Sequence, residues 1–169
     1  FMAGDDPFTR ERGFLYTLFV PARAHHAFPC FDQPDLKARY SLSLDVPVGW
    51  QAVANGAEAA TESEAQRTRI RFKQTQPIST YLFAFAAGEF SVETAERNGR
   101  EFRMFHRETD SVRVARNRDA IFDLHASALA WLEDYTAVSY PFGKFDFVAV
   151  PSFQFGGMEH PGVILYSAD

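Results

Sequence analysis

The sequence contains little of what several common kinds of site require. Cys30 is its single cysteine, which excludes an internal disulfide and any zinc site made of several cysteines. One cysteine fits a reducing compartment, so we expect a cytoplasmic protein, with a periplasmic or secreted location left open. The longest apolar runs, such as residues 81–88, are too short to cross a bilayer, and we expect no membrane span.

Positive charge is also scarce. Lys and Arg number 17 against 22 Asp and Glu, the formal net charge is -5, and no basic cluster stands out. We therefore expect no nucleic-acid partner, because such a partner requires a basic surface. The 169 residues allow one domain, or one domain and part of another. Phe1 precedes the first Met, and the chain stops at Asp169 directly behind an apolar run, so we expect a piece of a longer protein.

Phenylalanine is abundant, with 18 copies, and it suits strands. Residues 38–46 and 67–73 alternate apolar and polar side chains, which indicates strands with one buried face. The other strands predicted before residue 98 are 14–20, 50–54, 80–87 (central in its sheet) and 90–95, with Asn55-Gly56 as a turn and 57–66 as a hairpin tip. Short strands separated by turns predict a β-sandwich domain over residues 1–98.

The pattern changes in residues 99–169, for which we expect the beginning of an α+β domain. Strands are predicted at 101–105, 145–150 and 162–166. From about residue 112, apolar side chains recur at helical spacing and predict the buried face of a helix. That face is expected to contain Ile121, Leu124, Ala128, Leu132 and Tyr135, widened by Phe122, Leu129 and Trp131.

Most reactive side chains have an inert interpretation. Ser152 lacks the glycines of a nucleophile elbow, and no H-x-x-x-H pair lies on the helix to hold zinc. His125 is expected to be a hydrogen-bonded or solvated histidine at the edge of the buried face. Cys30 lies in an apolar setting that raises the thiol pKa, so we expect packing. Residues 28–38 predict a proline-stiffened corner in which the Asp32 carboxylate caps backbone N–H groups.

The segment richest in possible chemistry is Gly156-Gly157-Met158-Glu159-His160-Pro161-Gly162. Two glycines let a backbone approach another molecule closely. A carboxylate beside them suits the capture of a cation such as a substrate ammonium. A glycine-rich hairpin with an exposed glutamate explains the pattern equally well.

These segments resemble those of the aminopeptidase N family of zinc metallopeptidases. The N-terminal domain of that family has a corner similar to residues 28–38, and its catalytic domain has a G-A-M-E-N motif similar to residues 156–160. The approach at 140–151 and the exit at 162–166 are similar too, so the resemblance covers nearly the whole chain in order. It implies a mainly β chain: a saddle-like β-sandwich, then the α+β beginning of a thermolysin-like catalytic domain.

The resemblance also implies roles for the motif. Glu159 matches the glutamate that binds the free α-amino group of a peptide substrate, which implies an exopeptidase. Gly156 and Gly157 match positions whose backbone pairs with substrate like an added strand. Met158 matches the wall of the site, and His160 stands where the family has Asn.

Zinc in this family is held by an H-E-x-x-H helix and a later glutamate, with a later tyrosine at the oxyanion. All three lie downstream of the motif, beyond this sequence. The resemblance therefore implies zinc in the full-length parent, but no metal, no catalytic residue and no hydrolysis in this chain alone. Its partners would be peptides with a free N-terminus and the remaining catalytic and C-terminal domains.

The sequence departs from the family where Leu18 and Val20 align with polar residues that help hold the substrate's amino end. His160 also differs from Asn because a histidine becomes charged at lower pH. A second hypothesis is therefore a non-catalytic relative that serves as a protein-interaction scaffold. A third, an unrelated sugar-binding β-sandwich, needs an aromatic platform, whereas Trp50 and Trp131 are better explained as core residues.

Overall fold

The computed structural model describes residues 8–168, and this part of the chain is mainly β. Its helices are the long α1 (Ser111–Thr136) and the short 3-10 helices η1 (Ala24–His26) and η2 (Thr80–Leu82). The strands are β1 (Phe8–Glu11), β2 (Phe14–Thr17), β3 (Ser43–Pro47), β4 (Gln51–Ala54), β5 (Glu58–Glu64), β6 (Arg67–Phe72), β7 (Phe85–Gly88), β8 (Ser91–Arg97), β9 (Arg100–His106), β10 (Phe145–Val150), β11 (Gly157–Met158) and β12 (Val163–Ser167).

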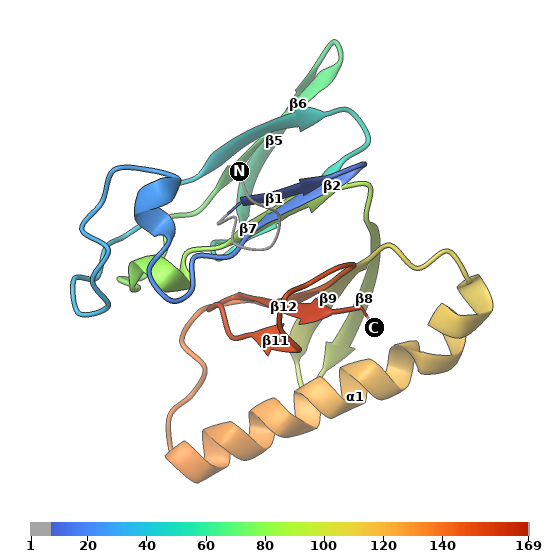
Figure 1. The fold of residues 1–169 in the computed structure, drawn as a ribbon. Helices are drawn as coiled ribbons and strands as arrows, with labels where there is room; N and C mark the ends of the chain where they lie inside the picture. The colour runs from blue at the N-terminus through green and yellow to red at the C-terminus, as the bar shows by residue number, and fades with distance from the viewer. Residues whose placement is uncertain (1–7, 169) are drawn as a thin grey trace.

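The described residues form three sheets and a helical layer (Figure 1). The outer sheet has the strand order β3-β6-β5, and the middle sheet has the order β1-β2-β7-β4. These two antiparallel sheets are the predicted N-terminal sandwich. The third sheet has the order β11-β12-β10-β9-β8, and α1 lies on its side away from the sandwich (Figure 1). Because α1 links the parallel strands β9 and β10, this part is the expected start of an α+β domain.

The sandwich core follows from side-chain alternation. On β6, Thr68, Ile70 and Phe72 are buried and the arginines between them are exposed. Ile70 and Phe72 pack against Val46 of β3 and Ala87 of β7. The alternation of side chains therefore predicts correctly which face of β6 is buried, because only the apolar face is covered by another sheet.

The prediction of a hairpin tip at 57–66 was wrong. Residues 58–64 form the edge strand β5, which pairs with β6 despite its polar composition because the backbone of β6 supplies the hydrogen bonds. The turn lies after it, with Ala65 at φ +51°. Asn55 and Gly56 close no hairpin either, because β4 pairs with β7, and the two residues lead from the middle sheet to the outer one.

Three predicted strands are shorter than expected, and the first, 14–20, ends at Thr17 as β2. Residues 80–82 form η2, and β7 begins only at Phe85, although it does lie centrally in its sheet. The strand predicted at 38–46 begins at Ser43. Before it, residues 38–42 bond to segment 72–78 only at intervals, through an isolated bridge between Ala38 and Ile78 and single bonds to the Tyr40 and Leu42 carbonyls.

The middle sheet uses its other face to pack on the third sheet. Phe14 and Tyr16 from β2 meet Val148, Val150 and Leu165 from β10 and β12 in one buried cluster. This core sets the sandwich directly against the strands that flank the glycine-rich motif. The domain boundary at residue 98 stays a prediction, and it falls in the turn between β8 and β9 of one sheet.

Helix α1 begins at an Asp110 cap, whose side chain accepts hydrogen bonds from the N–H groups of Val112 and Arg113. It contacts the sheet through Phe122, Ala126 and Leu129, which are all buried. These residues recur at i, i+4 and i+7 and so share one face.

The predicted buried face of α1 was correct for Phe122, Leu129 and the half-buried Ile121, but wrong for its other members, Ala128 among them. Leu124, Trp131 and Tyr135 are 68%, 61% and 75% exposed, and Leu132 is 48% exposed. The helix has apolar residues on more than one side, and the sheet covers only the side of Phe122. Trp50, in contrast, packs against the sandwich core as expected. No helix within residues 8–168 is long and apolar enough to cross a membrane.

Candidate functional site

The glycine-rich motif lies at the edge of the third sheet. β11 pairs with β12, and no described strand pairs with its other side. Burial alternates along the motif, since Met158 and His160 are buried whereas Gly157 and Glu159 are exposed. The buried residues attach the motif to the fold and leave its backbone and its carboxylate open to a ligand.

Glu159 directly follows β11 in a tight turn. The N–H of His160 bonds to the Met158 carbonyl at 3.0 Å, and the N–H of Val163 bonds to the His160 carbonyl at 3.1 Å. The Glu159 carboxylate itself makes no hydrogen bond or ion pair with any described residue. It is therefore a group of up to four acceptor sites whose partners must come from outside residues 8–168.

The two glycines are in different environments. A Cβ on Gly157 would lie 2.9 Å from Cδ1 of Tyr166, so the Tyr166 ring occupies the space that a side chain would need. A Cβ on Gly156 would have nothing within 4 Å. Gly157 is required by packing within this chain, whereas Gly156 borders open space at the sheet edge.

The turn after Glu159 is held by side chains from distant segments. The Tyr140 hydroxyl accepts from the Gly162 N–H at 2.8 Å, and the Lys144 Nζ donates to the Gly162 carbonyl at 2.6 Å. Asn55 Nδ2 donates to the Pro161 carbonyl at 2.9 Å. Sequence reasoning missed all three roles. Asn55 had the signature of a turn, and no local pattern reveals a bond across 106 positions.

An ionic cluster lies beside this turn. Asp146 is 2% exposed and receives two bonds from Arg103, Nη2 to Oδ2 at 2.6 Å and Nε to Oδ1 at 3.0 Å. Lys144 also donates to it at 2.7 Å, and Arg103 reaches Glu58 of the outer sheet at 3.0 Å. Burial lowers the pKa of Lys144, although the Asp146 carboxylate opposes the shift. The charges satisfy one another, so the cluster supports the turn without offering a free ligand.

His160 is a buried histidine without a polar partner among the described residues. The residue is 1% exposed, and neither ring nitrogen has a hydrogen-bond partner in residues 8–168. Burial lowers the pKa of His160 to about 3, because the charged ring would lose its hydration. In the folded protein His160 therefore gains its proton only near pH 3, well below the pH at which a solvated histidine does.

Leu18 and Val20 lie near the motif. Leu18 is 1% exposed and belongs to the buried cluster that contains Met158, and Val20 packs against the same cluster. The exit of β2 therefore lies next to the buried side of the motif and brings apolar side chains there.

Comparison with known proteins agrees with this arrangement. Residues 8–82 match the model of the peptidase M1 N-terminal domain, and residues 121–169 match that of the peptidase family M1 domain. The chain belongs to peptidase family M1.

Its relatives in that family are aminopeptidases. Aminopeptidase M1-A of Oryza sativa subsp. japonica is 31% identical over 92% of this chain and 17% of its own length. Glutamyl aminopeptidase of Homo sapiens is 33% identical over 92% of the chain and 16% of its own length. A probable M1 family aminopeptidase of Encephalitozoon cuniculi is 34% identical over 89% of the chain and 18% of its own length. The chain thus spans less than a fifth of the length of each of these relatives.

M1 peptidases are metallopeptidases, so the described residues were tested for a metal site. No three His, Cys, Asp or Glu side chains within residues 8–168 lie together as ligands. His125 has the inert role predicted for it, with Nδ1 2.8 Å from the Ile121 carbonyl and its ring stacked on Phe147. The residues present between 8 and 168 therefore do not fit zinc.

The other expected inert groups also have structural roles. Asp32 accepts from the backbone N–H of His25 at 3.2 Å and from the Thr80 hydroxyl at 2.5 Å, as a capping corner should. Burial raises the pKa of Asp32, but these hydrogen bonds outweigh it and hold the pKa below its usual value. Burial raises the pKa of Cys30, in agreement with packing.

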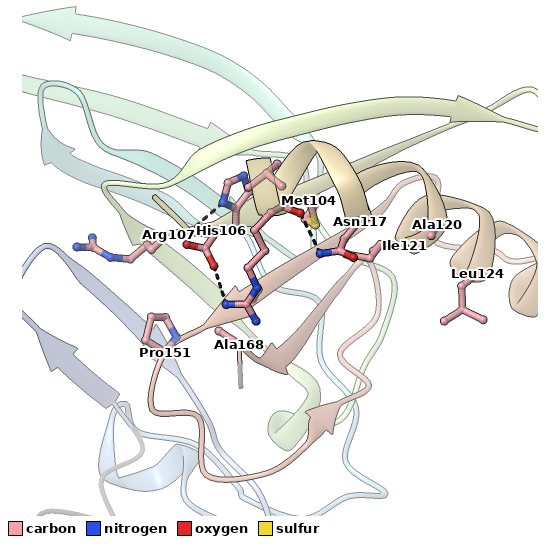
Figure 2. Close-up of a pocket in the computed structure, with 13 residues that line it drawn as sticks. Met104, His106, Arg107, Asn117, Ala120, Ile121, Leu124, Pro151 and Ala168 are labelled. Atoms are coloured by element: carbon pink, nitrogen blue, oxygen red, sulfur yellow. Dashed lines mark hydrogen bonds and ion pairs between the residues drawn. The ribbon is translucent and has the colours of Figure 1, made fainter. Parts of the chain in front are cut away.

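A groove of about 580 Å³ lies between the beginning of α1 and the ends of β9 and β10 (Figure 2). Its lining includes Leu124 and Ile121 of α1, and its charged pair, Glu108 and Arg113, is closed on itself at 2.9 Å. None of the five predicted M1 motif residues borders it. Its wall also contains His106, whose buried Nε2 has no hydrogen-bond partner among residues 8–168.

Proposed function

We propose that this chain is the N-terminal part of a zinc-dependent aminopeptidase that removes N-terminal residues from peptides. The carboxylate of Glu159 carries the proposal, because it is exposed beside a free strand edge and has no partner among the described residues. An ammonium is the ligand that such a carboxylate favours, since a charge-assisted hydrogen bond is about twice as strong as a neutral one. An internal peptide bond offers no ammonium there, so the selection is for free N-termini.

The backbone of the motif supplies the second part of substrate binding. The outer edge of β11 is open at Gly157 to pair with an extended peptide as an added strand, whereas the Gly156 carbonyl already accepts from the Ser167 N–H at 3.1 Å. Main-chain pairing fixes the direction of the peptide, and Glu159 at the end of the edge fixes its amino terminus. Met158 and His160 support this edge from inside and do not themselves bind the peptide amine.

Zinc would be held by parts of the parent outside residues 8–168. When bound, zinc in such an enzyme polarises the scissile carbonyl and activates water. This chain would bind and orient the amino end of the substrate, and alone it would hydrolyse nothing. The cytoplasmic location stays a prediction.

The exposed side of α1 supports an interface with the rest of the catalytic domain. Leu124, Trp131 and Tyr135 lie at i, i+7 and i+11, so they form one stripe, with Leu132 beside it. Contiguous apolar surface of this kind is uncommon where a protein faces water. The remaining catalytic domain is the partner that we assign to it.

A second candidate is a non-catalytic relative that uses the same scaffold to bind proteins. Leu18 and Val20 favour it, because apolar side chains there contribute nothing to holding an ammonium. Glu159 favours the peptidase, since an exposed carboxylate beside a free strand edge is suited to hold the ammonium of a peptide paired there.

The test requires the parent open reading frame, expressed beyond Asp169. We expect one zinc per chain and chelator-sensitive hydrolysis of alanyl or leucyl amides. Glu159→Gln should raise KM by at least tenfold, whereas Glu101→Gln, an exposed glutamate on β9 of the same sheet, should not. A well-folded parent without zinc or turnover would replace the peptidase with the scaffold.

A further inference from the structure

One buried amide joins the N-terminal sandwich to the turn that follows Glu159. Asn55 is 5% exposed and lies at the end of β4. Its Nδ2 donates to the Leu82 and Pro161 carbonyls, both at 2.9 Å, and its Oδ1 accepts from the Ala84 N–H at 2.7 Å. Leu82 and Ala84 belong to the sandwich, and Pro161 belongs to the motif. The side chain therefore bridges the two with its hydrogen-bonding capacity nearly filled.

The two backbones also touch at this point. Gly162 has φ +77°, and a Cβ there would lie 2.3 Å from the Asn55 carbonyl oxygen. Gly56 is equally confined, with a Cβ 2.0 Å from the Lys73 carbonyl oxygen. Neither position can accept a side chain, so Asn55 and the turn are held at backbone contact.

The position of Glu159 depends on this contact. The Glu159 carboxylate bonds to no described residue, so only the backbone on either side of it fixes its location. Before Glu159 the buried Met158 fixes the backbone, and after it the backbone is fixed by the buried His160 and by Pro161, whose carbonyl is held by Asn55. Tyr140 and Lys144 hold the next residue from the side of the third sheet.

We propose that Asn55 is a positioning residue for the amine-binding carboxylate, through which the N-terminal sandwich sets the place of Glu159. This inference rests on the proposed function of Glu159. A displacement of a binding group by about 1 Å is enough to cost a large factor in catalysis, so one hydrogen bond to the turn has a measurable consequence.

Asn55→Ala removes the donor to two part-buried carbonyls and also the acceptor of the buried Ala84 N–H. Ser79→Ala is the matched control. Ser79 is also 5% exposed, and its hydroxyl also donates to a proline carbonyl, that of Pro34 at 2.5 Å. That bond lies within the N-terminal corner and does not reach the motif. The two variants therefore lose the same kind of bond at different places.

The first measurement is amide hydrogen exchange in the full-length parent. Asn55→Ala should speed exchange at Gly162 and Val163 by about tenfold, because the turn opens more often without its bond. Exchange on β6 should stay unchanged. Ser79→Ala should leave 159–163 as in the wild type. This readout does not depend on enzymatic activity, and unchanged exchange at the turn in Asn55→Ala overturns the proposal.

The second measurement is a double-mutant cycle on amide hydrolysis. Asn55→Ala should raise KM about tenfold with a smaller change in kcat, and it should have little further effect when Glu159 is already Gln. Ser79→Ala should change neither constant. Additive effects of Asn55→Ala and Glu159→Gln would mean that Asn55 does not act through Glu159. An inactive wild-type parent would instead refute the proposed function and leave the exchange result to decide the role of Asn55.

Discussion

The outer sheet and helix α1, the two outer layers of the molecule, carry different kinds of side chain on their exposed sides. The outer sheet covers its solvent face with ion pairs, such as Arg67 to Asp45 at 2.7 Å and Arg71 to Glu62 at 2.6 Å. Helix α1 leaves Trp131 and Tyr135 stacked on each other and exposed, with ring centroids 5.0 Å apart. Both layers bury a phenylalanine on the inner side. The outer sheet thus carries paired charges on its exposed side, whereas α1 carries exposed apolar rings, as the proposed interface with further protein requires.

The largest effect should come from the inner side of α1. Phe122 of α1 is fully buried, and its ring packs against the ring of Phe147 on β10. Phe122→Ala should lower the free energy of unfolding of this chain by about 3–5 kcal/mol, from lost burial and the cavity left behind. Urea denaturation measures it, with Trp131→Ala on the exposed side as a control expected to stay within about 0.5 kcal/mol. Equal losses in the two variants would mean that α1 has no distinct inner and outer sides.

The next largest effect should be a loss of stability in acid that depends on the buried His160 and not on an exposed histidine. The folded pKa of His160, about 3, lies below the usual value of 6.5, so only the unfolded chain gains a proton between these pH values. The contribution of the neutral His160 to the free energy of unfolding is complete above pH 6.5. It declines as the pH falls, and about 3 kcal/mol is lost at pH 4. His160→Phe should flatten the pH dependence of stability, and His26→Gln, at an exposed histidine, should not. An unchanged slope in His160→Phe would contradict a neutral buried ring.

The outer side of α1 should behave differently in the chain and in the parent. Leu132→Lys with Tyr135→Lys should change the stability of the 169-residue chain by only about 0.5 kcal/mol, because both side chains are already exposed. The pair should reduce concentration-dependent association, as measured by analytical ultracentrifugation. In the full-length parent it should lower stability or expression clearly, since charges would then be buried. A parent that tolerates both lysines would show that the stripe faces solvent there as well.

The smallest effect should come from the ion pairs of the outer sheet. The hydrogen bond from Arg67 lowers the pKa of Asp45, so the pair is lost as the pH falls through that lowered value. Both groups are well exposed, and solvent screens them. Arg67→Ala should leave the urea midpoint almost unchanged at 0.15 M salt, with any difference from the wild type disappearing at 1 M. A loss as large as that of Phe122→Ala would show that the outer sheet depends on charge rather than on its core.

The local sequence pattern predicted those elements whose own apolar spacing specifies them as a strand or a helix. The alternation at 67–73 gave β6, and the apolar spacing beyond 112 gave α1. Asp110 then supplied a cap at the first turn. The polar run at 58–64 could not be recognised as a strand, because its pairing energy comes from β6 rather than from its own side chains. The motif itself was visible because its residues are adjacent.

The sequence by itself determined that the chain is β-rich and that a long helix follows the sandwich, and it singled out Gly156–His160 as the segment that we propose to bind a ligand. Tertiary structure decided which side of α1 is buried, because the helix has apolar residues on several sides and the sheet covers one. It also decided that Asn55 holds the turn, a bond between residues 106 positions apart. Such a contact exists only after two sheets have packed, because packing brings the amide to a carbonyl that no sequence spacing connects to it.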